Sequence, residues 1–190
     1  MQSFRMDSGR LSELIEVLKG WGQVWAPVEK GRDVFTLEPL DDPARARPEA
    51  LRTIIPFKKL LLRPRFAMMT GEAGEVARES RENDHGPTVF LGAHACDIHS
   101  LKILDLLYLS DFVDPYYRRN RENLTVVGYG CWPDEKCFCA SLGTSQVSDG
   151  FDLFLTPLEN RYLVTVGSAR GDDMARAAAA LLEPSGETET

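Results

Sequence analysis

Two apolar runs, each followed by a cysteine, decide the fold: Thr88-Val-Phe-Leu-Gly-Ala-His-Ala-Cys96-Asp97 and Leu124-Thr-Val-Val-Gly-Tyr-Gly-Cys131. A continuous apolar run bounded by turn residues is typical of a parallel strand buried on both faces. Between the runs, apolar residues recur at helical spacing from Asp97 to Leu109. A strand, a helix and a second strand form a βαβ unit with a right-handed crossover. We therefore predict parallel strands whose carboxyl ends lead into Cys96 and Cys131.

The segments on either side extend this core. The predicted outer elements are a helix at 8–19, strands at 23–28 and 33–40, a short helix opened by Asp114-Pro115, a hairpin of strands at 151–156 and 161–166, and a final helix at 172–182. Pro56 and Pro64 make residues 52–66 an extended basic segment, and 71–84 form a weak polar helix or a loop. The prediction is an α/β fold, with a single domain at 1–184 that has a central parallel βαβ core, a C-terminal hairpin and a final helix. Residues 185–190 are predicted to be a disordered tail.

Composition sets the class of protein. The 190 residues are 43% apolar and 27% charged, as in ordinary globular domains. No apolar run approaches the roughly 18 residues of a membrane span, and the N-terminus lacks the apolar core of a secretory signal. The net charge of −7 argues against a nucleic-acid partner. We expect a cytoplasmic protein, in which cysteines bind metal or stay as buried thiols instead of forming disulfides.

All four cysteines lie at the two strand ends and in the loop that follows the second: Cys96, Cys131, Cys137 and Cys139, with the spacing C-x34-C-x5-C-x-C. Parallel strands end at the same edge of a sheet, and the short loop after Cys131 can fold back over that edge. Four thiols are also the number that a tetrahedral metal ion or an iron–sulfur cluster needs. The spacing matches neither the usual structural zinc pattern nor the ferredoxin run. We predict that the four sulfurs converge on one metal centre.

Other interpretations stay open at this point. Cysteine is often a small buried hydrophobe, so the four thiols can be free, and a structural zinc ion needs the same number of sulfurs. Cys96 lies at a helix N-terminus, which can activate a thiol, although no histidine or acid pair at a recognisable spacing supports an enzyme. Asp97 is either a helix-capping acid, at the N-cap or in the first turn, or a ligand. Trp132 and Phe138 are expected to shield the centre from water. Further positive charge for the thiolates is expected from four basic residues, Lys58, Lys59, Arg118 and Arg119.

Short segments spread over most of the chain resemble the N-terminal region of the iron–sulfur (beta) subunit of soluble sulfhydrogenases, the NAD(P)-linked nickel–iron hydrogenases. They are more distantly similar to the A subunit of anaerobic sulfite reductase. The segments are Trp21-Gly22, Trp25-Ala26-Pro27, Arg52-Thr53-Ile54, Lys58-Lys59, Gly92-Ala-His-Ala-Cys96-Asp97-Ile98, Leu101-Lys-Ile-Leu-Asp105, Asp114-Pro-Tyr116-Tyr117, Cys131-Trp-Pro-Asp134-Glu135-Lys-Cys137-Phe-Cys139 and Gly150-Phe-Asp152-Leu-Phe. Taken together they are far more specific than a single motif.

The resemblance implies an electron-transfer role. Such subunits pass electrons between a catalytic hydrogenase or reductase subunit and a flavin subunit that uses NAD(P)H. It implies one cluster, a [4Fe–4S], and the matching ligand positions are Cys96, Cys131, Cys137 and Cys139, with Asp97 as a substitute ligand. Turnover of substrate is then expected on other subunits, so that this chain is a non-catalytic part of an oxidoreductase complex. A zinc-stabilised structural or assembly subunit of such a complex is the alternative.

One departure from the family concerns length. Family members continue into a ferredoxin-like half with two C-x2-C-x2-C-x3-C-P motifs, and this sequence contains neither. Either the chain is a stand-alone small subunit or a partner supplies those clusters. The partners that the resemblance implies are ferredoxin-like, flavin- or NAD(P)-binding and catalytic subunits.

Overall fold

A computed structural model describes residues 2–80 and 86–185 of the chain. Within these ranges the main sheet has eight strands in the order β10-β1-β9-β8-β7-β6-β2-β3, and β4 and β5 form a separate ribbon. The strands are β1 (Ser3–Asp7), β2 (Gln23–Gly31), β3 (Val34–Pro39), β4 (Met69–Thr70), β5 (Arg78–Glu79), β6 (Thr88–Ala93), β7 (Leu124–Tyr129), β8 (Leu153–Pro157), β9 (Arg161–Val166) and β10 (Glu183–Pro184). The helices are α1 (Leu11–Leu18), α2 (Ala95–Leu109), α3 (Pro115–Glu122) and α4 (Ala169–Ala177). The chain thus has the predicted α/β architecture.

The centre of the sheet is parallel. Strands β2, β6, β7 and β8 run in the same direction, and Thr88 of β6 pairs with Leu124 of β7. This confirms the predicted βαβ unit and adds a parallel neighbour on each side of it. Antiparallel strands complete both edges, with β3 beside β2 and with β9, β1 and β10 beyond β8. The predicted hairpin after the cysteine loop is the β8–β9 pair.

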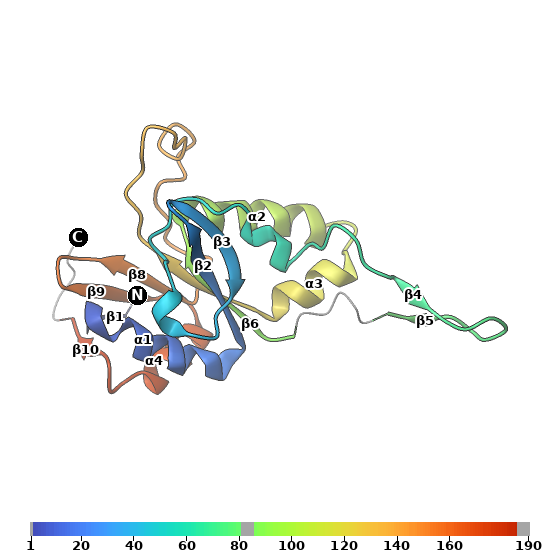
Figure 1. Ribbon diagram of the computed structural model, residues 1–190, viewed down its shortest axis with the longest axis horizontal. Helices are drawn as coiled ribbons and strands as arrows, with labels where there is room; N and C mark the ends of the chain where they lie inside the picture. Colours follow the sequence, from blue (N-terminus) through green and yellow to red (C-terminus); the bar gives the residue numbers. More distant parts are fainter. Residues whose placement is uncertain (1, 81–85, 186–190) are drawn as a thin grey trace.

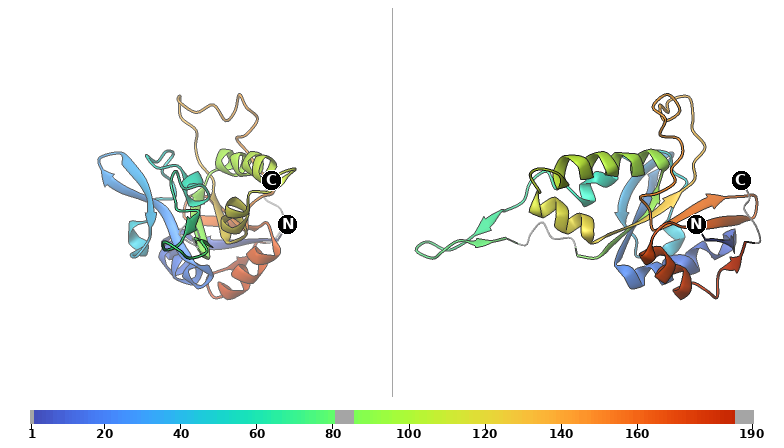
Figure 2. Two further views of the ribbon diagram at one scale, coloured as in Figure 1. Left: turned by 90° about the vertical axis from the view of Figure 1, so that its right-hand side faces the viewer. Right: turned by 180° about the vertical axis from the view of Figure 1, so that it is seen from behind.

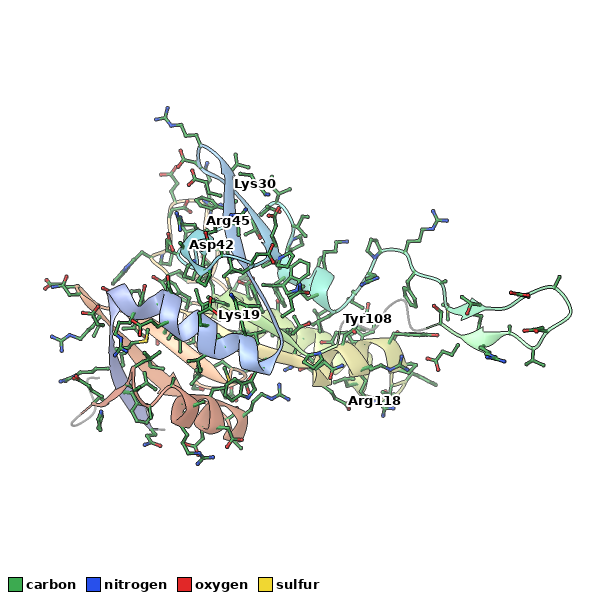
Figure 3. The ribbon with its side chains drawn as sticks, turned by 60° about the horizontal axis from the view of Figure 1, so that its bottom comes forward. Lys19, Lys30, Asp42, Arg45, Tyr108 and Arg118 are labelled. Carbon is green, nitrogen blue, oxygen red and sulfur yellow. The ribbon has the colours of Figure 1, made fainter. Side chains whose placement is uncertain are left out.

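Helices cover both faces of the sheet, as Figures 1 and 2 show. On one face α1 and α4 pack on a core that includes Val89 and Leu91 of β6. On the other face α2 and α3 pack on a core that includes Phe90. Successive side chains of a strand point to opposite faces, so one continuous apolar run serves both cores. Figure 3 labels Tyr108 of α2, whose ring stacks on Tyr117 of α3 with the centroids 4.9 Å apart.

A register shift interrupts β6 shortly before Cys96. Leu91 pairs with Val127 of β7, but Ala93 pairs with the adjacent Gly128, so Gly92 is an extra residue in β6. Gly92 has a φ of +101°, and a Cβ there would lie 3.2 Å from Pro27. Glycine is the residue that adopts this conformation without strain. The bulge ends the strand earlier than predicted, and α2 begins at Ala95 instead of Asp97.

Further differences from the predictions concern the outer elements. Strand β1 was not expected, and it lies between β9 and β10. The final helix begins at Ala169, because the Ser168 side chain accepts a hydrogen bond from the Gly171 N–H and caps its N-terminus. The segment expected as a weak polar helix or a loop at 71–84 is a loop over 71–77 and then the short strand β5 of the β4–β5 arm, which reaches away from the body of the protein (Figure 1). Residues 81–84 of this prediction lie outside the described residues.

Both ends of the described chain meet. The Ser185 hydroxyl and N–H both donate to the carbonyl of Ser3, at 2.8 and 3.2 Å. Most of the predicted disordered tail, residues 186–190, lies outside the described residues, so the domain boundary at 184 stays a prediction. Across the described ranges, no helix combines the length and the apolar character needed to cross a membrane.

Candidate metal centre

Cys96 lies in the first turn of α2, at the carboxyl edge of the parallel strands. The backbone N–H of His94, the N-cap residue, donates to the Asp97 carboxylate at 3.1 Å. Asp97 is therefore the first-turn acid of α2, one of its two predicted capping positions. Burial raises the pKa of Asp97, although the bond from His94 opposes this shift. The capping bond gives Asp97 a structural role that does not depend on any metal.

Cys131 follows the end of β7 and lies at the start of a long loop, residues 130–152. The loop is fixed at its start, where the Gly130 N–H donates to the Leu155 carbonyl at 2.8 Å. It is also fixed near its end, where His99 Nε2 of α2 is hydrogen-bonded to the Gln146 carbonyl at 2.8 Å. Figures 1 and 2 show that it rises from the sheet edge beside the N-terminal end of α2. The loop thus belongs to the same edge as Cys96.

Two turns shape the part of the loop that carries the other cysteines. The Cys137 N–H donates to the Asp134 carbonyl at 3.1 Å, and the Thr144 N–H donates to the Cys139 carbonyl at 2.8 Å. Cys137 and Cys139 are, like Cys96 and Cys131, partly buried free thiols. These two turns fix the local shape of the loop between Asp134 and Thr144.

Electrostatic interactions connect the cysteines. Burial, followed by the charges of Asp97, Cys139 and Cys131, raises the pKa of the Cys96 thiol to about 12. Burial and then the charges of Cys139, Cys137 and Asp97 also raise the pKa of Cys131. Neighbouring cysteines are therefore close enough to Cys96 and to Cys131 to oppose the ionisation of these two thiols. The four cysteines share one region of the protein, although their sequence positions are far apart.

The sulfurs are not arranged around a single ion. In the ranges that the structure describes, no three His, Cys, Asp or Glu side chains form a group that could hold a metal ion. A tetrahedral zinc ion bound to sulfur at about 2.3 Å would bring its sulfurs to about 3.8 Å from one another. The described side chains therefore do not form a closed zinc site.

Arg52 is a residue of this site that the sequence did not single out. Its Nη1 lies 3.1 Å from the Asp134 carboxylate and 3.7 Å from Cys137 Sγ, and its Nη2 also pairs with Asp134. The guanidinium holds the pKa of Asp134 well below its usual range. Arg119 was one of four basic residues expected to supply positive charge to the thiolates, but it pairs with Glu79 at 3.0 Å. The sequence signals for Arg52 were its place in the basic segment 52–66 and in a segment of the family resemblance.

The aromatic residues of the loop do not cover the cysteines. Trp132 is 81% exposed and Phe138 is 74% exposed, so the expectation that they shield the site from water is wrong for this chain on its own. Ile54, close in sequence to Arg52, is 71% exposed. These three side chains leave apolar surface around the cysteine loop, which is a common property of surfaces that contact another protein.

A small cavity lies beside the first turn of α2. It has a volume of about 200 Å³, and its lining includes Arg52, His94 and Asp97 together with the stacked rings of Phe57 and Phe90. His94 is 4% exposed, and its Nε2 has no hydrogen-bond partner among the described residues. The cavity therefore belongs to the same edge as the cysteines.

Among curated proteins, the chain is similar to sulfhydrogenase 2 subunit beta of Pyrococcus furiosus, with 41% identity over 173 residues. The match covers 91% of this chain and 51% of the relative, so the chain spans about half the length of the curated protein it matches. The resemblance to sulfhydrogenase beta subunits is confirmed. No protein-family model and no solved structure matches the chain.

Proposed function

We propose that this chain is an electron-transfer subunit of a multi-subunit redox complex of the hydrogenase or sulfur/sulfite reductase type, and that it carries one iron–sulfur cluster, a [4Fe–4S]. The observation that carries the proposal is the proximity of the cysteines: after burial, neighbouring cysteines are among the groups whose charge raises the pKa of Cys96 and of Cys131. The similarity to a sulfhydrogenase beta subunit supports it, because that relative is a subunit of a larger redox enzyme.

The donor set fits such a cluster. Cysteines bind metal as thiolates, and several thiolates that share a partly buried region need cationic charge to exist together. Four sulfur donors are the number that a [4Fe–4S] cluster uses. The proposed ligands are Cys96, Cys131, Cys137 and Cys139.

When bound, the cluster would supply one-electron redox chemistry. The protein would hold it at the edge of a rigid sheet, with Cys96 fixed by the first turn of α2 and Cys131 fixed by the end of β7. Asp97 would keep its bond to the His94 N–H and so hold the first turn in place. Electrostatics and burial around the sulfurs would then set the reduction potential.

The partners are other redox subunits, which bring ferredoxin-like, flavin or NAD(P)-binding and catalytic functions. The exposed side chains of Trp132, Phe138 and Ile54 support this part of the proposal, because a partner that covers them would exclude water from the cysteine loop. A short electron-transfer path would follow from contact at this surface. Catalysis on the partner subunits and a cytoplasmic location are parts of the same proposal.

Anaerobic purification tests the cluster directly. We expect bound iron and sulfide, and a broad absorption near 400 nm. In the Cys131→Ser variant we expect loss of the iron and faster backbone exchange in the loop at 132–140, because metal binding contributes to folding. Zinc in place of iron would favour the structural alternative, and full iron content in Cys131→Ser would contradict the ligand assignment.

The Asp97→Ala variant separates the two roles of this residue. Loss of a capping bond costs about 1 kcal/mol and should leave the iron content unchanged. The measurement pairs urea denaturation with iron analysis of the same sample. Loss of iron from a variant that is only slightly destabilised would make Asp97 a ligand.

A further inference from the structure

A guanidinium and a carboxylate enclose the sulfur of Cys137. Arg52 Nη1 lies 3.7 Å from Cys137 Sγ, and the same nitrogen lies 3.1 Å from Asp134 Oδ1. That oxygen accepts from the Cys137 thiol at 3.3 Å and from the Lys136 N–H at 2.9 Å. Arg52 lies 85 residues before Cys137, so this contact joins two distant parts of the chain.

Stability alone does not account for this arrangement. The Arg52 side chain is 52% exposed and that of Asp134 is 35% exposed, and exposed ion pairs contribute little to the stability of a fold. The contacts instead concern one sulfur and the turn that carries it. As a thiol, Cys137 donates to Asp134 and the sulfur stays in place. As a ligand it has lost its proton and can only accept, and Arg52 is then the neighbouring group that can donate.

We propose that Arg52 is a positioning residue for Cys137, which holds the turn at 134–137 in place and donates a hydrogen bond to the sulfur when that sulfur is a cluster ligand. This role rests on the proposed function, because it requires Cys137 to be a ligand. Hydrogen bonds and positive charge at the ligand sulfurs favour the more negative, reduced form of a cluster. Arg52 therefore raises the reduction potential of the site.

The test compares Arg52→Gln and Arg52→Lys with the wild type, all as anaerobically purified full chains. The matched control is Arg176→Gln, because Arg176 is an exposed arginine paired with Asp172 and Asp173 on α4. The midpoint potential is measured by a redox titration followed by electron paramagnetic resonance. We expect a lower potential in Arg52→Gln, partial recovery in Arg52→Lys and no shift in the control. A spectrum altered in Arg52→Gln alone would support the same conclusion.

A second measurement covers a variant that does not retain iron. In metal-free protein, hydrogen exchange of the amides at 134–137 should be faster in Arg52→Gln than in the wild type, and unchanged in the control. If an iron-loaded wild type and Arg52→Gln have equal potentials, or if the exchange rates of the metal-free proteins are equal, the role of Arg52 is overturned while the cluster stands. A wild type that takes up no iron overturns the proposed function, and the role of Arg52 falls with it.

Discussion

The Cys96 thiol of the metal-free protein should react slowly, because the fold makes its ionisation unfavourable. Burial and neighbouring negative charge raise its pKa from 9.0 to about 12. Near pH 8 the thiolate fraction is then about 900-fold lower than for a thiol with the ordinary pKa. A more basic thiolate is also the better nucleophile, which restores about 20-fold of the rate. The net expectation is alkylation about 50-fold slower than in the unfolded chain.

The assay is timed alkylation with iodoacetamide, followed by mass spectrometry of the peptide that contains Cys96. Metal is removed first, and native protein is compared with protein in urea. The rate for the unfolded chain should level off as the pH rises above about 9, because its thiols are then ionised. The rate for native protein should keep rising through that range, because the pKa of Cys96 is higher.

Variants identify the source of the effect. Asp97→Asn removes one of the charges that raise the pKa of Cys96, so it should speed up the reaction. Asp111→Asn changes an exposed acid after α2 and serves as the control. A native Cys96 that reacts as fast as the unfolded chain would refute the reasoning. It would also revive the interpretation of Cys96 as an enzyme nucleophile.

Two further predictions concern the elements around the site. Asp114→Ala removes the N-cap of α3, whose carboxylate accepts hydrogen bonds from two backbone N–H groups at 2.8 and 2.9 Å. The variant should lower the free energy of unfolding, measured by urea titration, by about 1 kcal/mol. The prediction fails if Asp111→Ala lowers it by as much. Gly171→Ala should destabilise the protein by about 1–3 kcal/mol despite the better helix propensity of alanine, because the new Cβ would clash with the Asp152 carbonyl oxygen. Gly20→Ala, where nothing lies within 4 Å of the new Cβ, is its control, and an unchanged melting temperature in Gly171→Ala would contradict this reasoning.

The sequence predicted the elements whose pattern is local. Strand β7 begins at Leu124, the first residue of the predicted apolar run, and ends shortly before Cys131, because the polar segments on either side mark both of its ends. Strand β1 was missed because Ser3–Asp7 has only two apolar residues, and its pairing partner β9 lies far along the chain. The start of α2 was misplaced because the bulge at Gly92 cannot be recognised from hydrophobicity.

Part of the candidate site, like part of the fold, could be predicted from the sequence. The order of strands was enough to bring Cys96 and Cys131 to one edge, since parallel strands end on the same side. Arg52 was not predictable, because its contact with Asp134 depends on the path of an irregular segment between distant positions. The exposure of Trp132 and Phe138 depends on the shape of a loop without regular structure, which residue type alone does not determine.

The extra residue in β6 has a consequence for how this protein can vary. An additional residue in one strand bends that strand and changes the direction in which the chain leaves the sheet. Here the change in chain direction comes immediately before His94 and Cys96. The backbone at Gly92, and not the body of α2, therefore determines the direction of the Cys96 side chain. The outer surface of α2 is thus free to diverge between relatives while the sulfur keeps its direction. Substitution of Gly92, by contrast, would change the direction of the Cys96 sulfur although no cysteine is replaced.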